Sequence, residues 1–222
     1  MTGAAAGSAA GLRRFARPAS RPGAAAGGAA ADGRCELCGE PIGSPHPHLV
    51  DPLHRSLACA CRACALLFTR SGGRYRTVPD RVCHDPRAPL TSAEWAELQI
   101  PVTVAFFFTN SALGRVVASY PSPAGVTECE LDLAAWDRLA GRHPLLRAPA
   151  PDVEAILVIG GPPPEPGPIE TFLVPVDVCY SLAGGLRQEW RGFDGGTEVR
   201  AILAGLLGGL RARARTLTGQ EA

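Results

Sequence analysis

Residues 34–68 have the sequence RCELCGEPIGSPHPHLVDPLHRSLACACRACALLF and carry two matched pairs of cysteines. Each pair has the spacing Cys-x-x-Cys: Cys35 with Cys38, and Cys61 with Cys64. Two intervening residues allow a tight turn to direct both sulfurs at one ion, and the glycine after the first pair relieves that turn. The twenty-two residues between the pairs fit a zinc ribbon, in which two knuckles on hairpins face each other. We therefore predict a tetrahedral zinc site with these four cysteines as ligands.

A closed set of four thiolates is typical of a structural metal site, because it leaves no position for water or substrate. A segment this short has few residues for a core, so the binding free energy of zinc becomes folding free energy. Iron in a rubredoxin-like site is the alternative, since a tetrahedron of four sulfurs accepts either metal. The ligand set also has two open alternatives. Cys59 could replace a cysteine of the second pair, and a histidine between the pairs (His46, His48 or His54) could replace another ligand.

Composition and charge argue against several classes of protein: nucleic-acid-binding, membrane-spanning and disulfide-rich secreted proteins. The chain of 222 residues is 46% hydrophobic and has a formal net charge of +1, so we expect a packed core and no global bias toward nucleic acid or anionic membranes. No apolar run approaches the roughly 18 residues of a membrane-spanning helix. The eight cysteines form close-set groups plus scattered single residues, which suits a metal site in a reducing compartment better than a disulfide framework. We therefore predict a cytoplasmic protein without a membrane span.

Four segments follow one another along the chain. Residues 1–33 form a tail of Ala, Gly, Pro and Arg that lacks bulky apolar side chains, and we predict that it is disordered. The tail has neither the apolar stretch of an export signal nor the Ser-rich amphipathic pattern of a transit peptide. Residues 34–70 form the cysteine module, 71–90 a basic connector and 91–217 an α+β domain.

Start signals and periodicity predict the elements of the α+β domain. Thr91 and Glu94 form a capping box at the start of a helix. Residues 102–109 alternate as a strand, and Phe107 lies opposite the other aromatic side chains, so both faces should be buried. The other expected strands are 115–120, 126–131, 155–159 and 171–176, the last at an edge because of Pro175. We also expect helices capped by Asp132 and by Asp177, a helix from about Thr197, a Pro-rich loop at 162–168 and a turn at 192–196. The predicted fold class is α+β: a small zinc-ribbon-like module followed by a mostly antiparallel sheet with packed helices.

Three further patterns contain reactive or nucleic-acid-binding residue types. Cys83, His84 and Asp85 are residue types found in catalytic triads, but a triad is assembled in space and sequence neighbours point in different directions. Cys179 would lie in the first turn of a helix, where a thiol pKa falls, yet its apolar stripe favours a core position. A basic flank beside the module is compatible with nucleic-acid binding, although few aromatic residues accompany it. Its arginines are Arg55, Arg62, Arg70, Arg74, Arg76, Arg81 and Arg87.

From Arg34 onward the chain resembles an uncharacterised bacterial family that is known only as a domain of unknown function. The matching segments are RCELC (34–38), HLVD (48–51), CACRACALLF (59–68), IPV (100–102), AFFF (105–108), YPSPAG (120–125) and WRGFDGG (190–196). Genes of this family tend to lie near genes for nickel–iron uptake hydrogenases. The resemblance therefore implies an accessory or assembly role around such an enzyme, and it supplies no catalytic residues.

These observations favour a non-catalytic accessory or assembly protein with a structural zinc site. Its partner would be another protein, such as a hydrogenase subunit or maturation factor. A rubredoxin-like iron electron carrier that uses the same four cysteines is the first alternative, and a zinc-ribbon nucleic-acid-binding protein is the second. A thiol enzyme that uses Cys59, Cys83 or Cys179 is the third.

Overall fold

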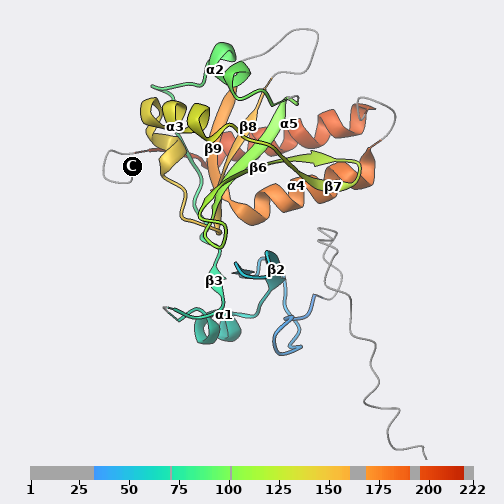
Figure 1. Cartoon of the computed structure of the whole chain (residues 1–222). Coiled ribbons are helices and arrows are strands. Elements are labelled where there is room, and N and C mark those ends of the chain that lie inside the picture. Colours follow the sequence, from blue (N-terminus) through green and yellow to red (C-terminus); the bar gives the residue numbers. More distant parts are fainter. Residues whose placement is uncertain (1–32, 71, 101, 161–168, 191–195, 218–222) are drawn as a thin grey trace, which may run out of the picture.

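Two sheets organise the computed structural model of the chain (Figure 1). The structure describes residues 33–70, 72–100, 102–160, 169–190 and 196–217. Within these ranges a three-stranded sheet has the order β2-β1-β3, and a seven-stranded sheet has the order β10-β4-β9-β8-β5-β6-β7. The predicted tail, the Pro-rich loop and most of the predicted turn at 192–196 lie outside the described residues.

The small sheet belongs to the cysteine module. β1 (His48–Asp51) and β2 (Ser56–Cys59) form an antiparallel hairpin, α1 (Arg62–Phe68) follows, and β3 (Arg76–Thr77) pairs with the other side of β1. The buried apolar cluster within the module is small: Cys35, Leu49, Ala60, Cys64 and Ala65. Two of these five are predicted metal ligands, so the module has little core apart from its cysteines.

The large sheet is antiparallel except at one edge, where β10 (Arg215–Thr216) runs parallel to β4 (Cys83–His84). Its other strands are β5 (Val104–Asn110), β6 (Arg115–Ser122), β7 (Gly125–Cys129), β8 (Glu154–Ile159) and β9 (Glu170–Pro175). The predicted α+β class, with a small cysteine module ahead of a mostly antiparallel sheet, is confirmed. The segment interpreted as a basic connector carries β3 and β4, and thus gives one strand to each sheet.

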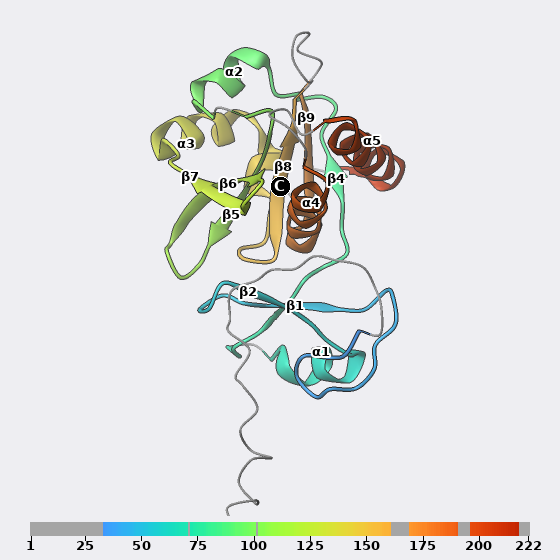
Figure 2. The same ribbon diagram turned by 90° about the vertical axis from the view of Figure 1, so that its right-hand side faces the viewer.

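Helices cover both faces of the large sheet (Figure 2). On one face lie α2 (Ser92–Glu97), α3 (Leu133–Arg142) and the short 3-10 helix η3 (Pro144–Arg147), and on the other lie α4 (Val176–Glu189) and α5 (Gly196–Arg213). Phe107 stacks on Trp136 of α3, with ring centroids 4.6 Å apart, whereas Phe106 and Phe108 point toward α4 and α5. The prediction that this strand is buried on both faces is confirmed, because its aromatic side chains alternate between two helical layers.

The start of α2 follows its sequence signal. The Thr91 side chain accepts a hydrogen bond from the backbone N–H of Glu94, and the Glu94 side chain bonds back to the N–H of Thr91. Glu94 Oε1 also lies 3.0 Å from His143 Nε2. This contact and the N–H of Thr91 lower the pKa of Glu94 to about 2. The capping box therefore also ties α2 to the end of α3.

Two predictions at the β9–α4 junction are wrong. β9 is an interior strand, with β4 on one side and β8 on the other, although Pro175 suggested an edge. The reason is that β4 pairs only with Phe172 and Leu173, so no neighbouring strand needs the N–H that Pro175 lacks. Asp177 is not the cap of α4, because Pro175 holds that position and Asp177 lies in the first turn.

Candidate metal centre

The first cysteine pair lies on a tight knuckle at the start of the module. The N–H of Gly39 donates to the carbonyl of Cys35 at 2.7 Å, and the N–H of Cys35 donates to the carbonyl of Glu40 at 2.8 Å. Gly39 has φ +79°, a conformation that residues with a Cβ rarely adopt, so the predicted role of this glycine in the turn is confirmed. The knuckle holds Cys35 buried and Cys38 exposed.

The second pair lies at the start of helix α1. The zinc-ribbon interpretation had instead predicted a second hairpin knuckle at this position. Cys61 is the N-cap, with extended backbone, and its sulfur accepts a hydrogen bond from the N–H of Cys64 at 3.4 Å. Residues one turn apart at a helix start direct their side chains to the same side, so the helix presents both sulfurs together.

The end of β2 fixes the two pairs relative to each other. The N–H of Glu36 donates to the carbonyl of Cys59 at 2.9 Å, and the N–H of Cys59 donates to the Glu36 carboxylate at 2.8 Å. Glu36 lies between the cysteines of the first pair, and Cys59 precedes the second pair by two residues. This double contact holds the knuckle against the chain that leads into α1.

The four sulfurs are close enough together to share one metal ion. The Sγ atoms of Cys35, Cys38, Cys61 and Cys64 all lie within 4.8 Å of one another, and those of Cys38 and Cys61 are 3.8 Å apart. Metal–sulfur bonds of about 2.3 Å in a regular tetrahedron place sulfurs about 3.8 Å from each other. The donor set therefore fits zinc or iron, and the four cysteines could hold one metal ion.

The thiols perturb one another in the way expected of a cation site. Burial opposes ionisation of Cys35, but backbone N–H groups of Cys61, Cys38 and Leu37 outweigh it and lower the pKa to about 6. Burial, together with the neighbouring cysteines, raises the pKa of Cys64. One thiol thus ionises easily while its neighbour resists the accumulation of negative charge. A divalent cation removes this conflict, because it stabilises all the thiolates at once.

The alternative ligands lie in a separate group. Cys59 is brought together with His46 and His48, and not with the four-cysteine cluster. His54 lies against Asp51, with its Nδ1 2.8 Å from the carboxylate. The structure therefore brings the four cysteines of the two matched pairs together and places Cys59 and these histidines outside that group.

The residues considered for catalysis are not assembled into a triad. Cys83 lies in the core of the large sheet, and the ring of His84 stacks on Phe172 with centroids 6.4 Å apart. Cys179 lies in the other core cluster, and burial raises its pKa. Burial also raises the pKa of Cys59, and the negative charges of Glu36 and Asp177 raise it further. The raised pKa values of Cys59 and Cys179 disfavour these two thiols as nucleophiles at neutral pH.

Much of the basic flank is paired with carboxylates. Arg74 contacts the buried Asp51 at 2.6 Å, and Arg55 contacts Glu128 at 2.9 Å. Arg76 contacts Asp152 at 2.6 Å, and Arg81 contacts Glu154 at 2.8 Å. Four of the seven arginines thus form ion pairs. Three of these four ion pairs join the module or the connector to the large-sheet unit. This pairing weakens the case for a phosphate-binding surface.

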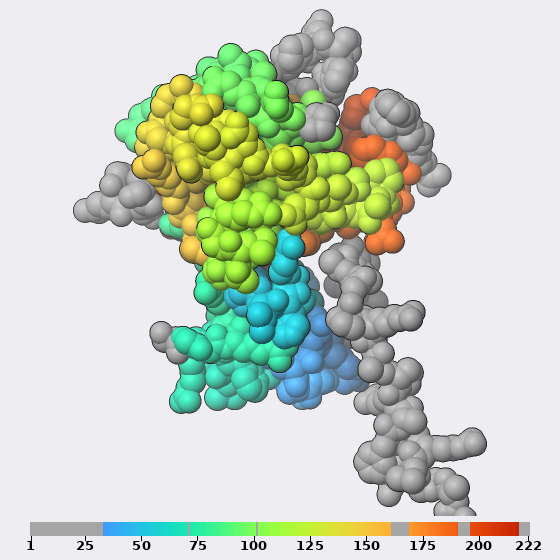
Figure 3. Space-filling view, in the orientation of Figure 1, coloured from blue at the N-terminus to red at the C-terminus, as the bar shows by residue number. Residues whose placement is uncertain are grey.

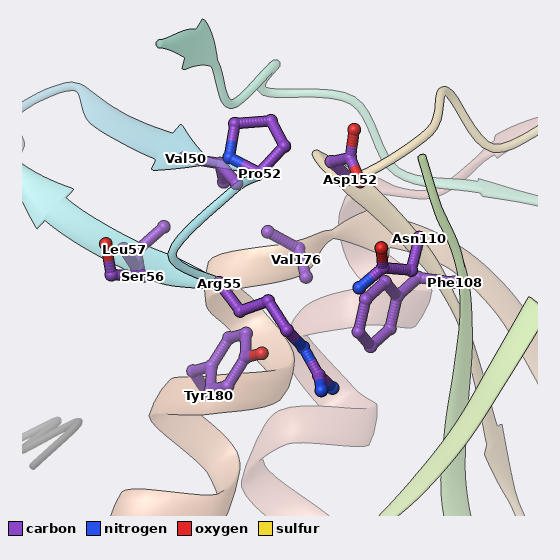
Figure 4. Close-up of a pocket in the computed structure, with 10 residues that line it drawn as sticks. All are labelled: Val50, Pro52, Arg55, Ser56, Leu57, Phe108, Asn110, Asp152, Val176 and Tyr180. Atoms are coloured by element: carbon purple, nitrogen blue, oxygen red, sulfur yellow. The ribbon is translucent and has the colours of Figure 1, made fainter. Parts of the chain in front are cut away.

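The module also contacts the large-sheet unit through apolar residues, and Figure 3 shows the two in contact at the lower end of that unit. Val50 of β1 packs with Val153 and Val176, and Leu57 and Tyr180 adjoin this cluster. A small pocket of about 30 Å³ lies at the same boundary (Figure 4). Module residues from β1 to β2 line one side, and residues of β5 and α4 line the other. The pocket is therefore a gap in an interface and carries none of the candidate ligands.

The fold and the cysteine cluster define a class: an α+β protein with a module in which four cysteines could hold a metal ion. The chain belongs to a family of unknown function, DUF5947, whose profile matches residues 34–214. No curated protein and no solved structure matches the chain. In the described part of the chain, none of the helices has both the length and the apolar character needed to traverse a bilayer.

Proposed function

We propose that this protein is a non-catalytic accessory or assembly protein whose four-cysteine site binds a structural zinc ion. The observation that carries the proposal is the cluster of four sulfurs within 4.8 Å of one another, in which Cys38 and Cys61 have the 3.8 Å separation expected around one ion. All four candidate ligands are protein sulfurs, so the site offers no open position for a substrate. Zinc bound there would supply folding free energy to a module that has only a small core.

A protein partner is favoured by the surface of α1. Three consecutive large apolar side chains are exposed there: Leu66 at 73%, Leu67 at 65% and Phe68 at 46%. In Figures 1 and 2, α1 lies at the end of the module away from the large sheet. Grouped apolar side chains on a soluble surface are typical of docking sites. The zinc module would thus act as a rigid support for this apolar face. The resemblance described above suggests a component of a nickel–iron hydrogenase system as the partner.

The docking proposal predicts a selective loss of partner. Full-length tagged protein, expressed in its native host, is expected to recover a hydrogenase subunit or maturation factor, and Leu66→Glu with Leu67→Glu is expected to abolish the recovery. Charges on this face would disrupt apolar contact without removing a buried residue. Leu113→Glu is the matched control, because Leu113 is also exposed (48%) but lies between β5 and β6. Failure of the unmodified protein to recover any hydrogenase component would refute this partner.

Metal content separates the structural site from an electron carrier. We expect the purified protein to contain zinc without iron and to be colourless, because Zn²⁺ has a full d shell and neither absorbs visible light nor changes oxidation state. Elemental analysis together with the visible absorption spectrum measures this. A coloured preparation that contains iron and bleaches on reduction would instead establish the rubredoxin-like alternative.

A further inference from the structure

A second group of metal-ligand side chains lies beside the four-cysteine cluster. One ligand atom each from His46, His48 and Cys59 lie within 4.8 Å of one another. The strand register explains the placement: His48 of β1 is directly opposite Cys59 of β2. Side chains of directly opposed residues share one face of an antiparallel pair, with Cβ atoms about 5 Å apart. His46 precedes His48 by two residues, and the two rings meet edge to face with centroids 4.8 Å apart.

Both imidazoles are oriented by hydrogen bonds at Nδ1. His46 Nδ1 lies 3.0 Å from the carbonyl oxygen of Gly43, and His48 Nδ1 lies 2.6 Å from Asp177 Oδ2. A carbonyl or carboxylate oxygen can only accept, so Nδ1 of each ring carries the proton. In a neutral ring Nε2 then keeps the lone pair that a metal requires. Carboxylate and carbonyl partners of this kind are the usual supports of metal-binding histidines.

Two polar atoms of this group have no partner. His46 Nε2 and Asp177 Oδ1 are buried, and neither makes a hydrogen bond in the described part of the chain. Buried polar atoms in native proteins are nearly always paired, so each such atom requires an explanation. An ion held between the two rings and the thiol would give the lone pair of His46 Nε2 its missing partner.

We propose that His46, His48 and Cys59 bind a second metal ion, a divalent borderline cation such as Zn²⁺, Co²⁺ or Ni²⁺. Two imidazoles and one thiolate suit this class of ion and not the hard cations Mg²⁺ and Ca²⁺. Three protein ligands leave one position open, unlike the closed four-cysteine set. Asp177, from the first turn of α4, is a positioning residue that holds the His48 ring. This site goes beyond the structural zinc site and does not depend on the identity of the partner.

Zinc stoichiometry of the full-length protein tests the proposal. The protein is equilibrated with excess Zn²⁺, freed of unbound metal by gel filtration and analysed for zinc per chain. We expect two ions in the unmodified protein and one in His46→Ala and in Cys59→Ser. His54→Ala and Cys129→Ser are the matched controls, since both residues lie outside the two groups, and each should retain two ions.

Asp177→Ala provides a test that leaves all ligands and the module sequence intact. Loss of a supporting carboxylate typically weakens metal affinity by 10- to 100-fold. Competition with a chromogenic chelator should therefore show the second Zn²⁺ bound about 10- to 100-fold more weakly, with the first unchanged. A stoichiometry of one zinc ion per chain in both the unmodified protein and His46→Ala would refute the second site but would remain consistent with the structural zinc site. No bound zinc at all would overturn both.

Discussion

Cys38→Ser is expected to unfold residues 35–68 while the seven-stranded sheet stays folded. The module has a five-residue buried cluster, and two of its members are candidate ligands. Structural zinc sites contribute apparent binding free energies of about 10–16 kcal/mol, far more than so small a core can replace. The large sheet has two extensive cores of its own, on its two faces, and does not depend on the ion.

Amide hydrogen exchange measures this directly. Protection of the β1–β2 hairpin amides, such as those of Leu49 and Ala58, should be lost in Cys38→Ser, while amides of β5 and β8 keep theirs. All three tryptophans (Trp95, Trp136 and Trp190) lie outside the module, so a urea transition followed by tryptophan fluorescence should be nearly unchanged. Cys129→Ser is the control thiol substitution. Native-like protection of the hairpin in Cys38→Ser would contradict a metal-dependent module.

Arg81→Met is expected to destabilise the large-sheet unit by about 3 kcal/mol, the lower end of the range for breaking a buried ion pair. Glu154 is 1% exposed, and both its carboxylate oxygens lie 2.8 Å from nitrogens of Arg81. The N–H of Ala150 donates to the same carboxylate at 2.8 Å. Removal of the guanidinium leaves a buried charge with a single backbone donor, and the arginine is itself one-third exposed, which moderates the loss.

A double substitution separates loss of the pair from loss of the arginine stem. Arg81→Met with Glu154→Leu should recover much of the stability, because an apolar pair of similar volume often replaces a buried ion pair without net cost. Urea unfolding followed by tryptophan fluorescence measures both variants. An Arg81→Met variant within 0.5 kcal/mol of the unmodified protein, a value typical of surface substitutions, would show that this contact is of no consequence for stability.

Local signals were sufficient for much of the α+β unit. The capping box at Thr91 and Glu94 predicted α2, and alternation around Phe107 predicted a strand buried on both faces, because each signal depends only on neighbouring residues. The interior position of β9 was missed, since its partner β4 has two residues and lies in an Arg- and Pro-rich segment with no strand periodicity. For the same reason, no signal in the sequence indicated the parallel pairing of β10 with β4.

Of the two candidate sites, one could be predicted from local sequence and the other could not. The four-cysteine cluster could be predicted because its spacing is short and repeated. The sequence did not distinguish a second hairpin knuckle from a helix start at Cys61, since Ala-Leu-Leu-Phe after Cys64 suits either. The histidine–cysteine group was not predicted as a site of its own. Its geometry depends on the register of β1 with β2 and on Asp177, which is 129 residues from His48. A His-x-His pattern ahead of a strand was the one available signal.

The placement of β3 and β4 limits how far the two units can separate. Thr77 ends the strand in the small sheet and Cys83 begins the strand in the large one, six residue steps along the chain. Six steps of fully extended backbone span at most about 22 Å. If the contacts between the units were broken, the module would stay confined to a volume around the start of β4, at an effective concentration in the millimolar range. Rebinding of the module to the large-sheet unit would be intramolecular. A partner that binds the surface between the two units would therefore have to compete with this rebinding.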